Sequence, residues 1–166
     1  MSLVTILTVL SIPFFFSQGL AQERLTIYYF GATSCGPCNR PEVIESLKKL
    51  PVAFKNVHTD LDTKFVMVCM DTNIQEGLIF IKKYELWDEI SIGSHYDNEL
   101  ALLVLNKTPM PGLPHIVVYR DTMKKTKYAS TIENRDLLKD IVGGKPIVEW
   151  VNSGMSLDLL DEQTKK

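Results

Sequence analysis

Cys35 and Cys38 are separated by two residues, Gly36 and Pro37. Two thiols at this spacing can close a disulfide when a helix start brings the sulfurs within bonding distance. They could also hold a metal ion, but a zinc site needs further ligands, and the sequence has neither a second Cys pair nor a His pair at zinc-like spacing. We therefore expect redox chemistry at this pair and no metal site.

The segments on either side should position the pair. Leu25–Phe30 is rich in β-branched and aromatic residues, which predicts a buried strand. Cys38–Leu50 has helical apolar spacing. A thiol at a helix N-terminus faces unpaired N–H groups and the positive end of the helix dipole, which stabilise its thiolate. We expect Cys35 to be the exposed nucleophile and Cys38 the more buried thiol that resolves a mixed disulfide.

The two residues between the cysteines fit the same role. Pro37 presets the backbone angle at the helix entry, and Gly36 lets the backbone of a partner come close. The third cysteine, Cys69, lies in the apolar stretch Phe65–Met70. We expect Cys69 to be a buried, inert thiol, and a regulatory or intermolecular partner is the alternative.

The remaining elements follow along the chain. Expected strands are Lys64–Met70, His115–Arg120 and Tyr128–Ile132, the last two forming a hairpin through Asp121–Lys127. Expected helices, one with Asp71–Asn73 as its cap and turn residues, are Ile74–Tyr84, Asn98–Leu105, Arg135–Val142 and Pro146–Val151. This order predicts an α/β fold with a central mixed sheet flanked by helices on both faces, and a helical or irregular insertion over Glu85–Pro111.

Two segments together resemble a known family. Phe30–Cys38 is similar to the active-site segment of thioredoxins, and Leu113–Tyr119 is similar to the segment in which a cis proline leads into that family's third core strand. The resemblance covers most of Leu25–Val142 and implies a thioredoxin-like thiol–disulfide oxidoreductase. It also implies that the bond before Pro114 is cis and lies against the cysteine pair. Alone, Pro114 would be read as an ordinary strand-entry proline.

The resemblance implies how a substrate would bind. A cis proline exposes the backbone of Leu113 for strand-like pairing with a peptide, so Gly36, Pro37, Leu113 and Pro114 are the expected substrate-binding residues. The sequence departs from the family at Ser34, where thioredoxins carry Trp, and at Tyr29, where they carry a buried Asp. We therefore assign the role of proton relay to no residue.

The ends of the chain differ from the middle. Residues 1–21 carry no charged side chain, and Gly19-Leu20-Ala21 offers small residues for cleavage before Gln22, which is typical of a secretory signal peptide. An uncleaved membrane anchor is the alternative. We expect a thioredoxin-like domain over residues 22–152 and a polar tail over residues 153–166. The family's N-terminal strand and helix are missing and the insertion is long, both of which resemble the exported, periplasmic branch.

Composition limits the partners. The 166-residue chain has a formal net charge of -2 and no dense Lys/Arg stripe, which argues against nucleic-acid binding. We expect a periplasmic or secreted protein, without stable membrane insertion after cleavage and without a cofactor other than the Cys35–Cys38 disulfide. Its partners would be cysteine-containing exported proteins and a membrane or soluble thiol redox partner.

The leading hypothesis for function is disulfide exchange on exported proteins, acting as a reductase, because Cys-Gly-Pro-Cys in thioredoxins goes with a low reduction potential of about -270 mV. The alternative is a non-catalytic binding module that keeps the thioredoxin-like fold and a structural disulfide. We further expect Glu85–Pro111 to border the active site and shape partner choice, because long irregular segments are often functional.

Overall fold

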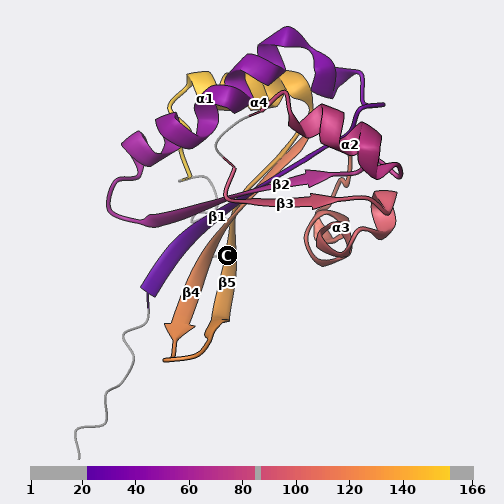
Figure 1. The fold of residues 1–166 in the computed structure, drawn as a ribbon. Coiled ribbons are helices and arrows are strands. Elements are labelled where there is room, and N and C mark those ends of the chain that lie inside the picture. Colours follow the sequence, from indigo (N-terminus) through magenta and orange to yellow (C-terminus); the bar gives the residue numbers. More distant parts are fainter. Residues whose placement is uncertain (1–21, 85–86, 158–166) are drawn as a thin grey trace, which may run out of the picture.

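A computed structural model describes residues 22–84 and 87–157 (Figure 1). The strands are β1 (Gln22–Gly31), β2 (Asp62–Cys69), β3 (Glu89–Ile92), β4 (His115–Lys125) and β5 (Ser130–Val142). The α-helices are α1 (Pro41–Val57), α2 (Ile74–Ile81), α3 (Glu99–Leu103) and α4 (Gly144–Asn152). Short 3-10 turns are η1 (Pro37–Asn39), η2 (His95–Asp97) and η3 (Leu105–Lys107).

In the described part of the chain, the strands form one five-stranded mixed sheet in the order β3-β2-β1-β4-β5. The central strand β1 pairs parallel with β2 and antiparallel with β4. Strand β3 pairs parallel with β2, and β5 pairs antiparallel with β4. Parallel β1 and β2 are connected through α1, so their carboxyl ends meet at one edge of the sheet, where the cysteine pair begins.

Helices cover both faces of the sheet, as the order of elements predicts. On one face α1, α2 and α4 bury a large core that includes Ile27 and Tyr29 of β1 together with Phe54 and Trp150 of the helices. On the other face α3 and η3 cover a smaller core around Phe30. Figure 1 shows α1, α2 and α4 above the sheet and α3 below its right-hand end. The mixed sheet between two helical layers is thus confirmed.

The helix that follows the cysteines begins later than the sequence analysis predicts. Cys38 lies in η1, and α1 begins at Pro41 and continues to Val57, past Pro51. Arg40, between them, has an extended backbone (φ -69°, ψ 136°), as a residue before proline prefers. The prediction of a helix over Cys38–Leu50 is therefore wrong at its start, because Pro41 separates the cysteine turn from the helix.

The predicted helix Arg135–Val142 is also wrong, because this segment is the second half of β5. The pairing shifts so that Val118 lies opposite Lys139 and Tyr119 opposite Leu137, which leaves Leu138 as an extra residue. Such a bulge reverses the alternation of a strand. Leu138 and Ile141 therefore pack on the same core although they are three residues apart, and this spacing mimics a helix in the sequence. The hairpin itself is present, with β4 extending to Lys125 and β5 starting at Ser130.

The insertion is more regular than expected. Glu89–Ile92, treated as irregular in the sequence analysis, forms the edge strand β3. The predicted helix Asn98–Leu105 is the shorter α3, and the Asn98 side chain caps it by accepting a hydrogen bond from the Leu100 N–H at 3.0 Å. The insertion thus supplies one edge of the sheet and the helix over its second face.

Some predictions fall outside the described residues. They are the signal peptide over residues 1–21 and the polar tail over residues 153–166, of which the structure describes only residues 153–157. Within the tail, Met155 is buried and its carbonyl contacts the His58 ring nitrogen at 3.2 Å. Within residues 22–84 and 87–157, no helix has the length and apolar character needed to cross a membrane.

Candidate active site

Cys35 and Cys38 form a disulfide just beyond the carboxyl end of β1, and their Cα atoms are 5.3 Å apart. Cys35 is partly exposed, whereas Cys38 is completely buried in the core under α1, α2 and α4. The two cysteines are therefore unequal in exposure: Cys35 is partly open to solvent and Cys38 is not. This inequality is what the spacing of the motif leads one to expect.

Backbone hydrogen bonds fold the segment into a tight turn. The Cys35 N–H donates to the Ala32 carbonyl at 3.2 Å. The Cys38 N–H in turn points at the Cys35 Sγ, at 3.2 Å. An N–H group placed at a sulfur stabilises a negative charge there when the disulfide is reduced. Gly36 and Pro37 are exposed, and no atom lies within 4 Å of where a Gly36 side chain would begin, so the backbone is open at this point.

The segment before β4 lies at the same end of the sheet as the cysteines. The bond between Leu113 and Pro114 is cis. Pro114 is buried, and its carbonyl accepts a hydrogen bond from the Gly143 N–H at 2.8 Å. Leu113 and Cys35 are both partly buried and both pack against the same two cores. The structure therefore brings the proline segment and the disulfide to the same end of the sheet.

Asp71, immediately beyond β2, anchors the start of the turn. Its carboxylate accepts hydrogen bonds from the Thr33 N–H at 2.9 and 3.1 Å and from the Thr33 hydroxyl at 3.0 Å. It also accepts one from the Cys69 thiol at 2.9 Å. Asp71 is only 6% exposed, so these bonds replace water around a buried carboxylate.

Asn39, at the end of the turn, binds the carbonyls of the same loop. Its side-chain Nδ2 donates to the Cys35 carbonyl at 2.7 Å and to the Thr33 carbonyl at 2.9 Å. Its Oδ1 accepts a hydrogen bond from the Lys83 ammonium, which lies just after α2. The turn is thus held at one end by a carboxylate and at the other by an amide that is bonded to a cation.

Buried polar groups lie on the core side of the turn. The Tyr84 hydroxyl donates to the Cys38 carbonyl at 3.4 Å, and the Tyr84 ring packs on Tyr29 with 5.9 Å between centroids. Burial raises the pKa of Tyr84 to about 12 and the pKa of Tyr29 well above its usual value. Burial, together with the hydrogen bond to Asp71, also raises the pKa of Cys69 to about 12. Cys69 is therefore a neutral, buried thiol, which fits the expectation of an inert residue.

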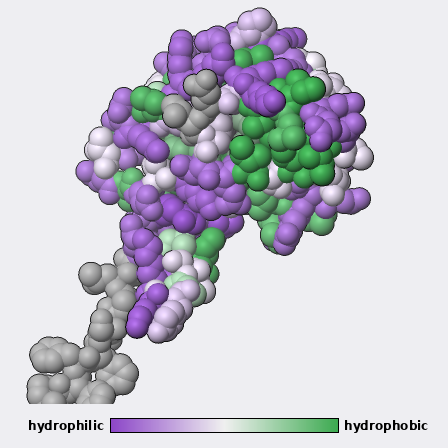
Figure 2. Space-filling model, viewed as in Figure 1, coloured by the Kyte–Doolittle hydropathy of each residue, from purple (hydrophilic) through white to green (hydrophobic). Residues whose placement is uncertain are grey.

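Apolar side chains are exposed on the elements that flank the turn. Helix α2 exposes Ile74, Leu78 and Ile79, and Figure 2 shows a hydrophobic area over this helix. The Thr33 hydroxyl, which donates to Asp71, also lies 3.3 Å from the Glu76 carbonyl of α2, so this helix contacts the turn directly. From the insertion, α3 exposes Leu102, which is 50% accessible.

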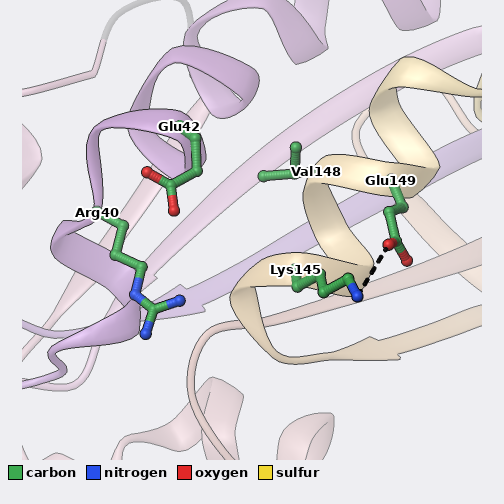
Figure 3. A pocket seen from close by; sticks show the side chains of 5 residues that line it. All are labelled: Arg40, Glu42, Lys145, Val148 and Glu149. Atoms are coloured by element: carbon green, nitrogen blue, oxygen red, sulfur yellow. Dashed lines mark ion pairs between the residues drawn. The ribbon is translucent and has the colours of Figure 1, made fainter.

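A charged cleft of about 330 Å³ opens on another side of the turn (Figure 3). It lies between the start of α1 and helix α4 and is lined by Arg40, Glu42, Lys145, Val148 and Glu149. Lys145 and Glu149 form an exposed ion pair at 3.7 Å. Helix α4 begins close to the cysteines, because a side chain at Gly144 would meet the Pro37 carbonyl at 3.5 Å.

The fold and the disulfide together define a class. A central β1 between parallel β2 and antiparallel β4, a Cys-x-x-Cys disulfide after β1 and a proline segment before β4 constitute a thioredoxin-like fold with a redox-type cysteine pair. Among the described residues, no group of three His, Cys, Asp or Glu side chains could hold a metal ion.

Solved structures of thioredoxin-fold proteins are similar to this chain at low sequence identity. A thioredoxin-like protein from Bacteroides caccae is 11% identical over 78% of this chain and 40% of its own, with a TM-score of 0.47. A protein described as a putative thiol:disulfide interchange protein DsbE from Chlorobium tepidum is 14% identical over 84% of this chain and 82% of its own, with a TM-score of 0.49. The thioredoxin domain of a thiol-disulfide oxidoreductase from Bacteroides vulgatus is 14% identical over 84% and 81%, with a TM-score of 0.48.

No protein-family model matches the sequence, and no curated protein matches it. The chain also spans less than half of the Bacteroides caccae structure. The fold therefore follows from the strand order and connections described above, and the chemistry follows from the residues of the site.

The structure brings together the residues that the sequence analysis selected, which are Cys35, Gly36, Pro37, Cys38, Leu113 and Pro114. The sequence analysis missed Asn39, Lys83 and Tyr84, and it treated Asp71 only as a cap and turn residue. A signal for Asp71 was available, because a polar residue that follows a strand parallel to β1 must lie at the same sheet edge as the cysteines. Asn39 and Lys83 gave no such signal, because their contact joins segments that the sequence pattern does not align.

Proposed function

We propose that the chain is an exported thiol–disulfide oxidoreductase that exchanges its Cys35–Cys38 dithiol and disulfide with cysteines of partner proteins, acting as a reductase. The observation that carries the proposal is the unequal pair: a disulfide at the end of β1 with one sulfur accessible and the other buried. A purely structural disulfide has no need of an accessible sulfur, an open glycine beside it and a polar network around its turn.

The reaction balances with the residues present. In the reduced protein, the Cys35 thiolate attacks one sulfur of a partner disulfide, forms a mixed disulfide and releases the other partner sulfur as a thiolate, which takes up a proton. The Cys38 thiol then loses its proton and attacks Cys35 Sγ, which re-forms the Cys35–Cys38 disulfide and releases the second partner sulfur. The partner gains two electrons and two protons, and no metal or organic cofactor takes part.

A partner peptide would lie across the turn and the proline segment. The open backbone at Gly36 and Pro37 would admit the chain on one side of the sulfur. The backbone of Leu113, before Pro114, would pair with the peptide as a short strand on the other. Main-chain pairing of this kind accepts many sequences, which suits an enzyme whose substrates share only a cysteine.

We place the protein outside the cytoplasm, in the periplasm or secreted, because of the apolar leader over residues 1–21. A reductase in an oxidising compartment must be recharged, so a membrane or soluble thiol donor is a required partner, and cysteine-containing exported proteins are the substrates. The reduction potential of the pair tests the direction: a value near about -270 mV supports a reductase, and one near about -120 mV would make the protein an oxidant.

Insulin reduction with dithiothreitol as electron donor tests the activity. We expect the wild-type protein to accelerate precipitation of the insulin B chain and Cys35→Ser to abolish the acceleration. Cys69→Ser is the matched control, because it removes a thiol that takes no part in the disulfide, and it should retain most of the turnover. No turnover by the wild type with any reductant would support a binding module with a structural disulfide instead.

We further propose that the insertion over Glu85–Pro111 shapes partner choice. Deleting it would remove β3 and core residues of α3, so a surface change is the cleaner test. Leu102, Leu103 and Met110 are 50%, 51% and 66% exposed, and replacing all three by Ser should change the relative rates towards two unrelated protein disulfides while the rate towards a small-molecule disulfide stays the same. Equal changes for every substrate would contradict this role.

A further inference from the structure

The late start of α1 removes an expected source of thiolate stabilisation. A helix that began at Cys38 would direct its first N–H groups at Cys35, but α1 begins only at Pro41, after a three-residue 3-10 turn. The effect of a helix dipole falls off within its first turn. One backbone N–H, that of Cys38, points at the Cys35 sulfur. Side chains near the turn can therefore add to the stabilisation of the Cys35 thiolate.

Lys83 and Asn39 are placed to make that contribution. The Lys83 ammonium donates to Asn39 Oδ1, and Asn39 Nδ2 donates to the Cys35 carbonyl at 2.7 Å. The amide dipole thus points its positive end at the segment that carries the nucleophile. A hydrogen bond to an ion polarises the amide and strengthens the bonds that the amide donates.

The Lys83 ammonium is held close to the cysteine turn. The ammonium lies over the Phe80 ring, 5.2 Å from the centroid, and the side chain is partly buried. Among the residues that the structure describes, no carboxylate lies within ion-pair distance of it. A partly desolvated cation acts on its surroundings more strongly than an exposed one.

We propose that Lys83 and Asn39 form a positioning pair that stabilises the Cys35 thiolate of the reduced protein; the inference rests on the proposed function, because it concerns the nucleophile of that exchange. Neither residue touches the sulfur. Lys83 acts through Asn39, and Asn39 fixes the carbonyls of Cys35 and Thr33. The pair therefore couples α2 to the reactivity of the turn.

Other charged or titratable groups surround the turn and must be held constant in a test. Asp71 binds Thr33 from the end of β2, and Tyr84 binds the Cys38 carbonyl from the core side. Arg40 follows the turn and is exposed. Helix α2 also carries Glu76, whose carbonyl lies 3.3 Å from the Thr33 hydroxyl. All four remain in place when only Lys83 is changed.

The test is the pH dependence of Cys35 alkylation by iodoacetamide in the reduced protein, with the modified residue identified by peptide mass spectrometry. Since only the thiolate reacts, we expect Lys83→Met to slow alkylation of Cys35 about threefold or more below neutral pH and to leave the high-pH plateau unchanged. Lys83→Arg should restore most of the rate. Lys82→Met is the matched control: it removes the same charge one residue earlier, from an exposed side chain, and should not shift the profile.

A second variant distinguishes the pair from a general charge effect. In an Asn39→Ala background, Lys83→Met should produce less of the shift that it produces in the wild type, because the connecting amide is gone. Equal shifts with and without Asn39, equal shifts for Lys82→Met and Lys83→Met, or a Lys83→Met profile that matches the wild type would each overturn the proposal. The assay uses no protein partner, so failure of insulin reduction with an intact Lys83 effect would contradict only the proposed function.

Discussion

Two buried aspartates stand at the two ends of the sheet, and they are satisfied in different ways. Asp121 lies on β4 and is 0% exposed, and Asp71 follows β2 and is 6% exposed. Arg135 Nε and Nη2 donate to the two carboxylate oxygens of Asp121 at 2.6 and 2.9 Å. Among the described residues, Asp71 receives hydrogen bonds from uncharged donors, the N–H and O–H of Thr33 and the S–H of Cys69.

The surroundings of Asp121 make it a structural ion pair. The Thr26 hydroxyl donates to its carboxylate at 2.6 Å, and Arg24 lies 3.6 Å away. The Arg135 guanidinium also lies over the rings of Tyr119 and Tyr28, at 5.0 and 5.6 Å from the centroids. Burial alone would raise the pKa of Asp121, but the hydrogen bonds from Arg135 and Thr26 outweigh it and lower that pKa.

We infer that the Asp121 end contributes mainly to stability and the Asp71 end to the reactivity of the cysteine turn. At the Asp121 end, opposite charges contact each other directly, and the Asp121 carboxylate links β4 to Thr26 of β1 and Arg135 of β5. At the Asp71 end, the anion and the cation are separated: Asp71 binds the start of the cysteine turn and Lys83, through Asn39, its other end. Separated charges can shift the pKa of a neighbouring thiol, whereas two opposite charges in direct contact largely cancel each other's effect on nearby groups.

The largest expected effect is from Asp121→Ala. It leaves Arg135 and Arg24 without their buried partner, and removal of one member of a buried pair costs about 3 kcal/mol or more. Urea unfolding monitored by circular dichroism measures the loss. Asp136→Ala is the control, because its pair with Arg120 is exposed at 3.9 Å and should cost less than about 0.5 kcal/mol. Similar losses for the two variants would contradict a structural ion pair at Asp121.

Asp71→Asn should cost less stability and change reactivity more. The amide keeps the shape but replaces one acceptor by a donor, so part of the bonding to Thr33 and Cys69 is lost, at about 1–2 kcal/mol. Because the start of the turn is then less well held and a negative charge is gone, alkylation of Cys35 in the reduced protein should change in rate, whereas Asp121→Ala should leave that rate unchanged. If the two variants changed Cys35 reactivity equally, the division between the two ends would be wrong.

The stability contributed near Asp71 should be lost at high pH, and that contributed by Asp121 at low pH. Cys69, whose pKa is raised to about 12, contributes stability that is present below the unfolded pKa of about 8.5 and is lost as the pH rises towards the folded value, at about 1–2 kcal/mol by pH 10. Cys69→Ser should flatten this part of the stability curve. Asp121, whose pKa is lowered, contributes stability that is lost as the pH falls below about 4. An identical alkaline slope in wild type and Cys69→Ser would contradict the first statement.

The smallest expected effect is from Arg135→Lys. Lysine keeps the charge next to Asp121 but loses the two-point hydrogen bonding and the stacking on Tyr119 and Tyr28, which should cost about 1 kcal/mol. Thermal unfolding gives the measurement. A loss as large as that of Asp121→Ala would show that the geometry of the guanidinium, and not the charge pairing, holds this end together.

Sequence reasoning found what is local and missed what depends on distant partners. Strands β1 and β2 were predicted because their apolar runs are continuous, and the Asn73 cap is present, with its Oδ1 accepting a hydrogen bond from the Gln75 N–H at 2.8 Å. The short strand β3 was missed because its side chains are largely exposed and it has order only through pairing with β2. The bulge at Leu138 misled the analysis of β5, because a bulge is set by the opposite strand.

The same division applies to the site. The cysteines and Pro114 were found from their spacing and from the family resemblance, and both signals are read from short stretches of sequence. The groups that hold the turn come from other elements: Asp71 from the end of β2, and Lys83 and Tyr84 from the end of α2. Only packing of these elements on the sheet reveals the contacts.

Trapping of a mixed disulfide tests the assignment of Cys35 as the nucleophile. We expect reduced Cys38→Ser to form a stable disulfide-linked adduct with a partner disulfide through Cys35, visible on non-reducing gels and mapped by mass spectrometry. We expect Cys35→Ser to form none, because Cys38 is buried. An adduct formed through Cys38 in Cys35→Ser at a rate equal to that of Cys38→Ser would contradict the assignment of Cys35 as the nucleophile.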